Sequence, residues 1–319
     1  MLKKIIVIFA CFLIVGTIST ALGYVKNYNS KPIENIVVAE VIDQQQTTDC
    51  GQGCPFFSYL WLAQGFTPTL ETITKVELKL FKIGDINSDI LLSLRSSLTG
   101  SDLTSVSVSG NQVAGYGKWI EFDFNDITVN PNQMYYIVCR TSGGSMVNYY
   151  CCLFQINNPY SGGEVWGSLN SGSTWEIIEY PGYPDPDGCF IQYGLDESPN
   201  IPEIDGPTEG KEGEEYTFFI SATDPESHDI YYSVSWGDDT NTGWLGPYSS
   251  GEEISLSHSW SSKGKYIILA QAKDVYNVVS EWGEFELEIP RFRANLNYLF
   301  LKMIEQFNII FNFFGNKFI

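Results

Sequence analysis

Short runs in which polar and apolar residues alternate limit most strongly what this chain can fold into. Residues 75–80 read Lys-Val-Glu-Leu-Lys-Leu, and residues 119–124 read Trp-Ile-Glu-Phe-Asp-Phe. Alternation with a period of two places the apolar side chains on one face of a β-strand. Glycine, proline and asparagine separate these runs, and the runs lack helical periodicity. The pattern predicts an all-β fold built from β-sandwiches.

Changes in composition divide the chain of 319 residues into segments. The strand pattern gives way to Asp-Glu-Ser-Pro-Asn-Ile-Pro at residue 196, a composition typical of a linker. About 160 residues precede it, a usual size for a jelly-roll-like sandwich. We predict a signal peptide (1–23), a polar leader (24–35), a jelly-roll-like β-sandwich (36–195), a linker (196–202), a second β-sandwich (203–290) and an apolar C-terminal tail (291–319).

The N-terminus has the pattern of a secretory signal peptide. Lys3 and Lys4 precede an apolar run at residues 5–15, which is too short to span a membrane comfortably. Small residues such as Ala21 and Gly23 suit cleavage. We therefore expect an extracellular or cell-surface location. The alternative is that this segment remains as a membrane anchor.

The C-terminal tail is strongly apolar but interrupted by polar residues, among them Lys302 and Glu305. It falls short of an uninterrupted membrane span. We expect a short helical hydrophobic tail that packs on protein or lies at a membrane surface. Such a tail would associate the protein with the membrane or the cell envelope.

The formal net charge of -20 excludes one class of partner and favours one kind of ligand. Negative charge of this size repels the phosphates of nucleic acids, so no nucleic-acid partner is expected. Calcium takes carboxylate and carbonyl oxygens and suits such a chain.

Six of the seven cysteines lie beyond the signal peptide, and Cys11 lies within it. An even number in an exported chain favours disulfides, whose pairing the sequence leaves open. The alternative is a zinc site at the Cys-x3-Cys spacing, which would need thiolate ligands alone. The six are Cys50, Cys54, Cys139, Cys151, Cys152 and Cys189.

The sequence Trp-Gly-Asp-Asp-Thr at 236–240, with His258-Ser259-Trp260 and Gly264-x-Tyr266 downstream, resembles the PKD (polycystic kidney disease) domain family. Asp239 stands where that family usually has glycine, and the family's His-x-Tyr element here ends in tryptophan. The resemblance implies an immunoglobulin-like sandwich in an exported protein, usually a non-catalytic spacer or adhesion module.

Two further resemblances concern the first sandwich. The stretches 43–44, 64–68, 119–124 and 135–140 look like a jelly-roll-like module that accompanies PKD-type domains in secreted archaeal proteins, and the tail is similar to tails of the same proteins. That likeness implies a role at the cell surface. Residues 168–175 resemble a single Asp-box, with Asn170 in place of aspartate, which implies a structural hairpin turn.

Acidic residues on two loops of the second sandwich are candidate calcium ligands because they can share a cation through several oxygens. The alternative is that they form turns with their own backbone. Asp43, Asp187 and Asp196 flank the first sandwich, where calcium is expected only by analogy. The candidate ligands on the loops are Asp224, Glu226, Asp229, Asp238 and Asp239.

Aromatic residues in a Gly- and Pro-rich region are candidates for carbohydrate binding, because exposed rings on loops stack on sugar faces. The alternative is that they belong to the core and to hairpins. They are Tyr160, Trp166, Trp175, Tyr180 and Tyr183.

Catalytic motifs such as His-Glu-x-x-His and Gly-x-Ser-x-Gly are absent from the sequence. We expect His258 to pack against the turn at Asp238 rather than act as a base. The predicted function is a non-catalytic binding or adhesion protein without an organic cofactor, whose partners are surface glycans or envelope proteins. One alternative is a secreted glycoside hydrolase that uses a carboxylate pair. Another is a purely structural envelope component.

Overall fold

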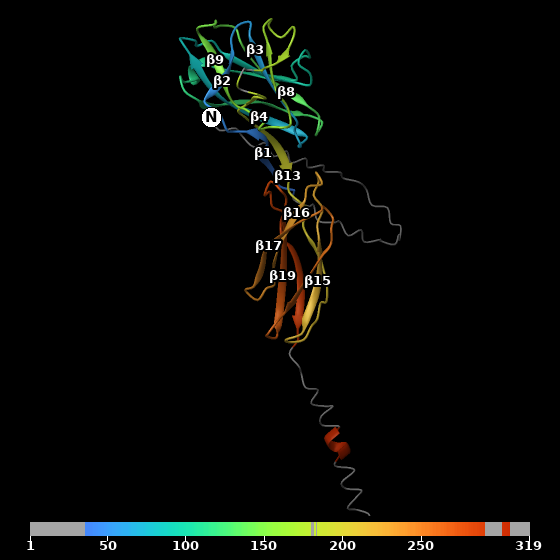
Figure 1. The fold of residues 1–319 in the computed structure, drawn as a ribbon. Coiled ribbons are helices and arrows are strands. Elements are labelled where there is room, and N and C mark those ends of the chain that lie inside the picture. Colours follow the sequence, from blue (N-terminus) through green and yellow to red (C-terminus); the bar gives the residue numbers. More distant parts are fainter. Residues whose placement is uncertain (1–35, 180–181, 183, 291–301, 307–319) are drawn as a thin grey trace, which may run out of the picture. The chain divides into compact units, whose positions relative to one another are not determined.

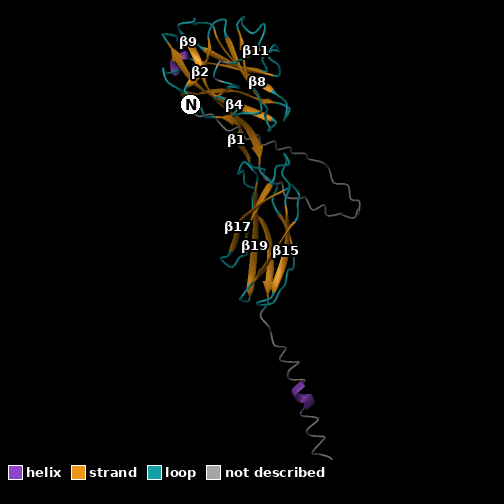
Figure 2. Cartoon of the chain, in the orientation of Figure 1, coloured by secondary structure: helices purple, strands orange, loops and turns teal. Residues whose placement is uncertain are grey.

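The computed structural model describes residues 36–179, 182, 184–290 and 302–306. The predicted signal peptide, the leader and most of the tail lie outside these residues. Residues 302–306 form a single short helix. Within the described part of the chain, helices are too short or too polar to cross a membrane. Nearly all other regular structure is β-strand, which confirms the predicted all-β class (Figures 1 and 2).

Two antiparallel sheets form the first sandwich. One sheet has the order β1 (Val38–Gln46), β13 (Phe190–Glu197), β4 (Thr72–Ile83), β9 (Tyr149–Gln155) and β12 (Asp187–Gly188), with β2 (Gln52–Phe56) paired to β9 and β7 (Lys118–Thr128) paired to β4. The other has the order β11 (Glu176–Ile177), β10 (Val165–Ser168), β3 (Trp61–Phe66), β8 (Tyr135–Thr141), β5 (Ile90–Arg95) and β6 (Thr104–Val108). One 3-10 turn, η1 (Gly110–Gln112), precedes β7.

Alternation along the strands explains the first core. In β7, Ile120 and Phe122 are buried, whereas Glu121 and Asp123 are exposed. Their neighbours on β4 follow the same rule, since Val76 pairs with Phe122 and is also fully buried. Burying one face of each strand in this way provides the main stabilisation of a sandwich.

The second sandwich has a three-stranded and a four-stranded antiparallel sheet. Its hydrophobic cluster is separate from that of the first and includes Phe218, Tyr232, Trp236, Trp260 and Leu287. This division of strands is that of an immunoglobulin-like sandwich. The strands are β14 (Glu203–Asp205), β15 (Glu215–Ser221) and β18 (Ile254–Ser259) in one sheet, and β17 (Asn241–Tyr248), β16 (Ile230–Ser235), β19 (Gly264–Lys273) and β20 (Gly283–Ile289) in the other.

The strands β1 and β13 run antiparallel, so the start of one lies beside the end of the other. Val38 pairs with Glu197, and Ser198 N–H donates to the Val37 carbonyl at 2.8 Å. β13 therefore extends two residues into the segment predicted as linker, because Val38 and Ala39 continue the ladder. Asp196 is one of these two residues.

Candidate functional site

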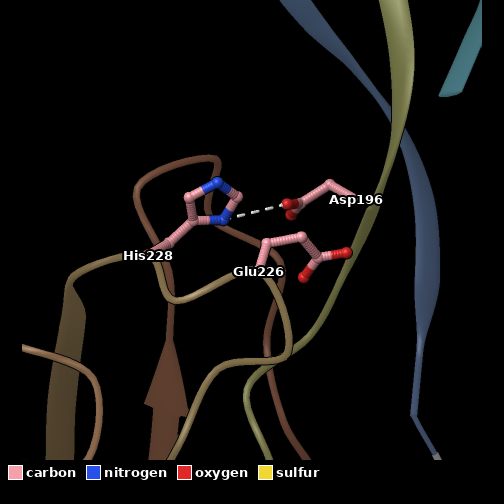
Figure 3. Close-up of side chains that lie close together, drawn as sticks. All are labelled: Asp196, Glu226 and His228. Atoms are coloured by element: carbon pink, nitrogen blue, oxygen red, sulfur yellow. Dashed lines mark ion pairs between the residues drawn. The ribbon is translucent and has the colours of Figure 1, made fainter. Parts of the chain in front are cut away.

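Four carboxylates from three parts of the chain gather at the end of β13. We call Asp196, Asp224, Glu226 and Asp274 the acidic cluster. Asp196 comes from β13, Asp224 and Glu226 from the loop between β15 and β16, and Asp274 from the loop after β19. His228 lies with them. Figure 3 shows the side chains of Asp196, Glu226 and His228 close together, and one ligand atom from each lies within 4.8 Å of the others.

The sequence of the first loop fixes its shape. Oδ1 of Asp224 accepts hydrogen bonds from the backbone N–H of Glu226 at 3.1 Å and of His228 at 2.9 Å. Ser227 adopts a left-handed conformation with φ 67° between them. Aspartate favours such turns because its side chain bonds to the backbone a few residues onward.

The loop after β19 is held by side-chain hydrogen bonds of the same kind. Oδ1 of Asp274 accepts hydrogen bonds from the backbone N–H of Tyr276 at 2.7 Å and of Val278 at 3.1 Å. Asn277 has φ 66° within this turn. In each loop, one aspartate oxygen is therefore occupied by the backbone, while the position of the other oxygen is fixed.

The remaining oxygens of the acidic cluster are buried without hydrogen-bond partners among the described residues. They are Oδ2 of Asp224, Oδ2 of Asp274, Oε2 of Glu226 and both oxygens of Asp196. Asp196 and Asp274 are both 0% exposed. Buried polar atoms normally have a partner, so a group of five without one marks an unusual site.

One imidazole partly balances this negative charge. Nδ1 of His228 lies 3.2 Å from Oδ1 of Asp196 and 3.5 Å from Oδ1 of Asp224. The contact with Asp196 raises the pKa of His228, against the lowering effect of burial. The ring also meets the edge of Tyr276, with 5.2 Å between ring centroids.

Burial and mutual repulsion raise the pKa values of three carboxyl groups in the acidic cluster. Burial, followed by the charge of Asp196, raises the pKa of Glu226 to about 7 and that of Asp274 to about 7. Burial also raises the pKa of Asp224. The charged forms are costly here, so the site is suited to hold protons or a cation.

The structure brings together two of the five loop residues considered as calcium ligands, Asp224 and Glu226. Asp229 is exposed on the same loop, outside this group. Asp238 instead contacts His258 and Thr240, and Asp239 is exposed in the turn at 236–240 with φ 68°.

The other acids considered at the first sandwich lie elsewhere. Asp43 accepts hydrogen bonds from Thr69, and Asp187 accepts from Gln64 and from the Tyr160 backbone. Sequence reasoning missed Asp274 and His228 as members of one site. The one available signal for Asp274 was its place at the end of the alternating strand β19.

The aromatic residues considered for sugar binding have mixed environments. Tyr160 packs against Phe190, and its hydroxyl joins Gln44 and the Thr67 backbone. Trp166 and Trp175 are half-buried near the β10–β11 hairpin. Tyr180 and Tyr183 lie outside the described residues.

A pocket of about 200 Å³ lies beside this hairpin and has an acidic lining. Four of its lining residues are Glu164, Glu179, Asp185 and Asp187. Burial raises the pKa of Asp187 to about 6, although hydrogen bonds from Tyr160 and Gln64 oppose the shift.

The segment that resembles an Asp-box forms a closed turn. Oδ1 of Asn170 accepts from the Thr174 backbone at 2.9 Å, and the indole of Trp175 donates to the Gly172 carbonyl at 3.1 Å. Asparagine thus supplies the acceptor oxygen that the motif needs. These contacts are those of a structural hairpin turn.

Of the six cysteines considered for disulfides, Cys50, Cys139, Cys151, Cys152 and Cys189 are free thiols in this structure. Five of the six are buried, and Cys50 is half-buried. Cys54 and Cys152 are direct partners in the β2–β9 ladder. Among the described residues, the cysteines form no group of three with metal-binding spacing.

Comparison with known proteins finds a similar solved domain for one part of the chain. No family model and no curated protein matches the sequence. A solved PKD domain of an M14-like peptidase from a Thermoplasmatales archaeon is 44% identical, over 30% of this chain and 99% of that domain, with a TM-score of 0.30. This chain is thus similar to a PKD domain over part of its length, and the motif residues at 236–240 lie in the second sandwich.

Two other similar structures are enzymes. The glycoside hydrolase domain of Endo-D from Streptococcus pneumoniae is 10% identical with a TM-score of 0.24, and it covers 79% of this chain. A β-glucuronidase from Ruminococcus gnavus is 12% identical with a TM-score of 0.21, and it covers 73% of this chain. This chain spans about a third of each, 33% and 36% of their lengths. Likenesses this distant carry no argument about function.

Proposed function

We propose that the protein is an exported, non-catalytic binding or adhesion protein of the cell surface, in which the second sandwich is a spacer. The observation that carries this proposal is the 44% identity to a PKD domain over 99% of that domain. The N-terminal signal-peptide pattern supports export, and the apolar tail supports retention at the envelope. In this proposal the first sandwich carries any binding, with surface glycans or envelope proteins as partners.

Cell fractionation tests the location. Antibody against the second sandwich should detect the native protein at the cell surface or in the medium, and protease added to intact cells should remove it. Detection in the cytosol alone would overturn the proposal.

A glycan array with the chain lacking residues 1–23 tests binding. Binding to a defined glycan, reduced by Trp166→Ala or Trp175→Ala, supports a carbohydrate partner. A surface protein that binds no glycan on the array would instead support an envelope-protein partner or a purely structural component.

The glycoside hydrolase alternative rests on a separate observation. Glu164 and Asp187 line one pocket, and the pKa of Asp187 is raised, as for a general acid. A hydrolysis screen with matched Glu164→Gln and Asp187→Asn variants decides between the two classes. Hydrolysis that both variants abolish would establish an enzyme.

A further inference from the structure

We propose that the acidic cluster binds one calcium ion, which joins the end of β13 to the two loops of the second sandwich. The proposal does not depend on the location or the partners of the protein. It goes beyond the loop residues that the sequence suggested, because it requires Asp196 and Asp274 and excludes Asp229.

Buried oxygen atoms without partners are the first reason. Asp196 and Asp274 are 0% exposed. Of their four carboxylate oxygens, only Oδ1 of Asp274 has a hydrogen-bond partner among the described residues. Ionised carboxylates are rarely buried unless they are paired or coordinate a metal. Among these side chains a single imidazole, that of His228, supplies positive charge, and it contacts Asp196 and Asp224.

The number and kind of free oxygens identify the ion. The acidic cluster presents four of them, one from each side chain, and a fifth oxygen, Oδ1 of Asp196, lies 3.2 Å from Nδ1 of His228. Calcium takes six to eight oxygen ligands in flexible geometry, so water or a carbonyl oxygen would complete the set. Magnesium keeps several waters and demands a near-octahedral site. Zinc favours nitrogen and sulfur ligands, of which this site offers one.

The loops are held in place by the second oxygen of each side chain. Asp224 and Asp274 each accept two backbone N–H groups through Oδ1, and Oε1 of Glu226 accepts the Glu197 N–H at 3.3 Å. Backbone contacts of this kind orient metal ligands before the ion arrives.

Calcium titration of the full chain, stripped with EGTA, tests the proposal. We expect one ion per chain by calorimetry and a rise in melting temperature with calcium. Terbium provides a second readout, because a lanthanide at this site would lie close enough to the ring of Tyr276 for sensitised luminescence. Calcium should then displace the terbium.

Two variants and a matched control locate the ion. Asp196→Asn and Asp274→Asn should each weaken calcium binding at least ten-fold. Asp229→Asn, which removes the same charge from the loop that carries Asp224 and Glu226, should leave it unchanged. In Asp274→Asn the side-chain oxygen that accepts from Tyr276 and Val278 can remain, so the loop is expected to fold.

Melting temperatures distinguish a calcium ligand at Asp274 from a merely structural residue. If Asp274 is a ligand, Asp274→Asn in EGTA at pH 7.5 should melt at the same or a higher temperature than the parent, because it relieves repulsion from Asp196. With calcium, the parent should melt higher than the variant. A variant that is destabilised equally with and without calcium would overturn the proposal.

Three further outcomes decide whether the site exists and whether calcium is its ligand. The absence of binding at millimolar calcium, or an equal loss of affinity in Asp229→Asn, would overturn the site. Tighter binding of zinc or manganese, abolished by His228→Gln, would overturn calcium as the ligand. Calcium binding that persists in His228→Gln would support it.

Discussion

The Nε2 atom of His258 lies 2.8 Å from Oδ2 of Asp238, and this contact closes the turn at residues 236–240. The imidazole also stacks on Trp236 at 4.8 Å between ring centroids, with an interplanar angle of 6°. His258 therefore packs against the acidic turn, as the sequence predicted, and stabilises the motif on which the resemblance to PKD domains rests.

Replacing His258 with alanine should destabilise the chain by about 1–2 kcal/mol at pH 7, through loss of a charge-assisted hydrogen bond and of ring packing. Burial alone would raise the pKa of Asp238, but hydrogen bonds from Thr240 and His258 outweigh it and lower this pKa. A lowered folded pKa gives stability above the unfolded value near 4, which is lost as pH falls.

Urea denaturation of the parent and His258→Ala at pH 7 and pH 3 measures this effect. The difference between the two should shrink at pH 3, because the stability that comes from the lowered pKa of Asp238 is lost as pH falls below the unfolded value near 4. An equal difference at both pH values would contradict the contribution of the ion pair. Asp239→Asn, in the same turn but without the histidine contact, is the control.

Stability in EGTA should fall as pH rises from about 5 to 7.5. The pKa values of Glu226 and Asp274 are raised to about 7 in the folded chain, whereas unfolded acids titrate near 4. The folded state therefore holds more protons in this range, so stability decreases with pH. His228, whose pKa is also raised, and Asp224 act in the same direction.

Thermal melts at pH 5, 6 and 7.5 in EGTA check this pH dependence. Glu226→Gln and Asp274→Asn should each reduce it. Asp187→Asn is the comparison variant, because Asp187 lies outside the acidic cluster. Its pKa is raised to about 6, so it should account for a separate part of the pH dependence near pH 6. A flat profile for the parent would contradict the assigned shifts.

The left-handed conformation of Asp239 leads to a third prediction. Asp239 has φ 68°, which glycine adopts freely, aspartate tolerates and β-branched residues resist. Asp239→Gly should change the free energy of unfolding by no more than about 0.5 kcal/mol, while Asp239→Val should lower it by about 1–2 kcal/mol. Urea denaturation of both variants measures the contrast, and equal stability would contradict it.

Cysteine reactivity should depend on burial. Burial raises the pKa of Cys139, Cys151 and Cys189 to about 12, and it raises the pKa of Cys152 well above its usual value. In the reduced native chain at pH 8, an alkylating reagent should therefore modify Cys50 first among the six.

Peptide mapping by mass spectrometry, before and after unfolding in urea, identifies the modified residues. Rapid native labelling of Cys139 or Cys152 would contradict the assigned burial. The same map on unreduced protein from its native source tests disulfides, for which the β2–β9 ladder favours Cys54 with Cys152.

Local patterns predicted the strands because the cause of strand burial is itself local. The alternation at 119–124 became β7 with its apolar face inward, and the acidic turn at 236–240 became the turn beside β16. Each of these features is specified by residues adjacent in sequence, and the hydrophobic pattern sets the register of the strands.

The acidic cluster could not be predicted in the same way, because the chain brings its members together from distant positions. Asp196 and Asp274 meet only once both sandwiches have formed. Asp229 is close to Glu226 in sequence but is exposed, since the turn at Ser227 reverses the chain between them. Proximity along the loop therefore led the prediction to include Asp229, whereas Asp196 was considered only for the first sandwich.

The pairing of Val38 with Glu197 has a mechanical consequence. The described chain enters β1 and leaves β13 at the same end of the sheet, where Val37 and Ser198 exchange two hydrogen bonds. A pulling force along the chain would load this point first and open the β1–β13 ladder one hydrogen bond at a time. The rest of the first sandwich would bear no tension until that ladder had opened.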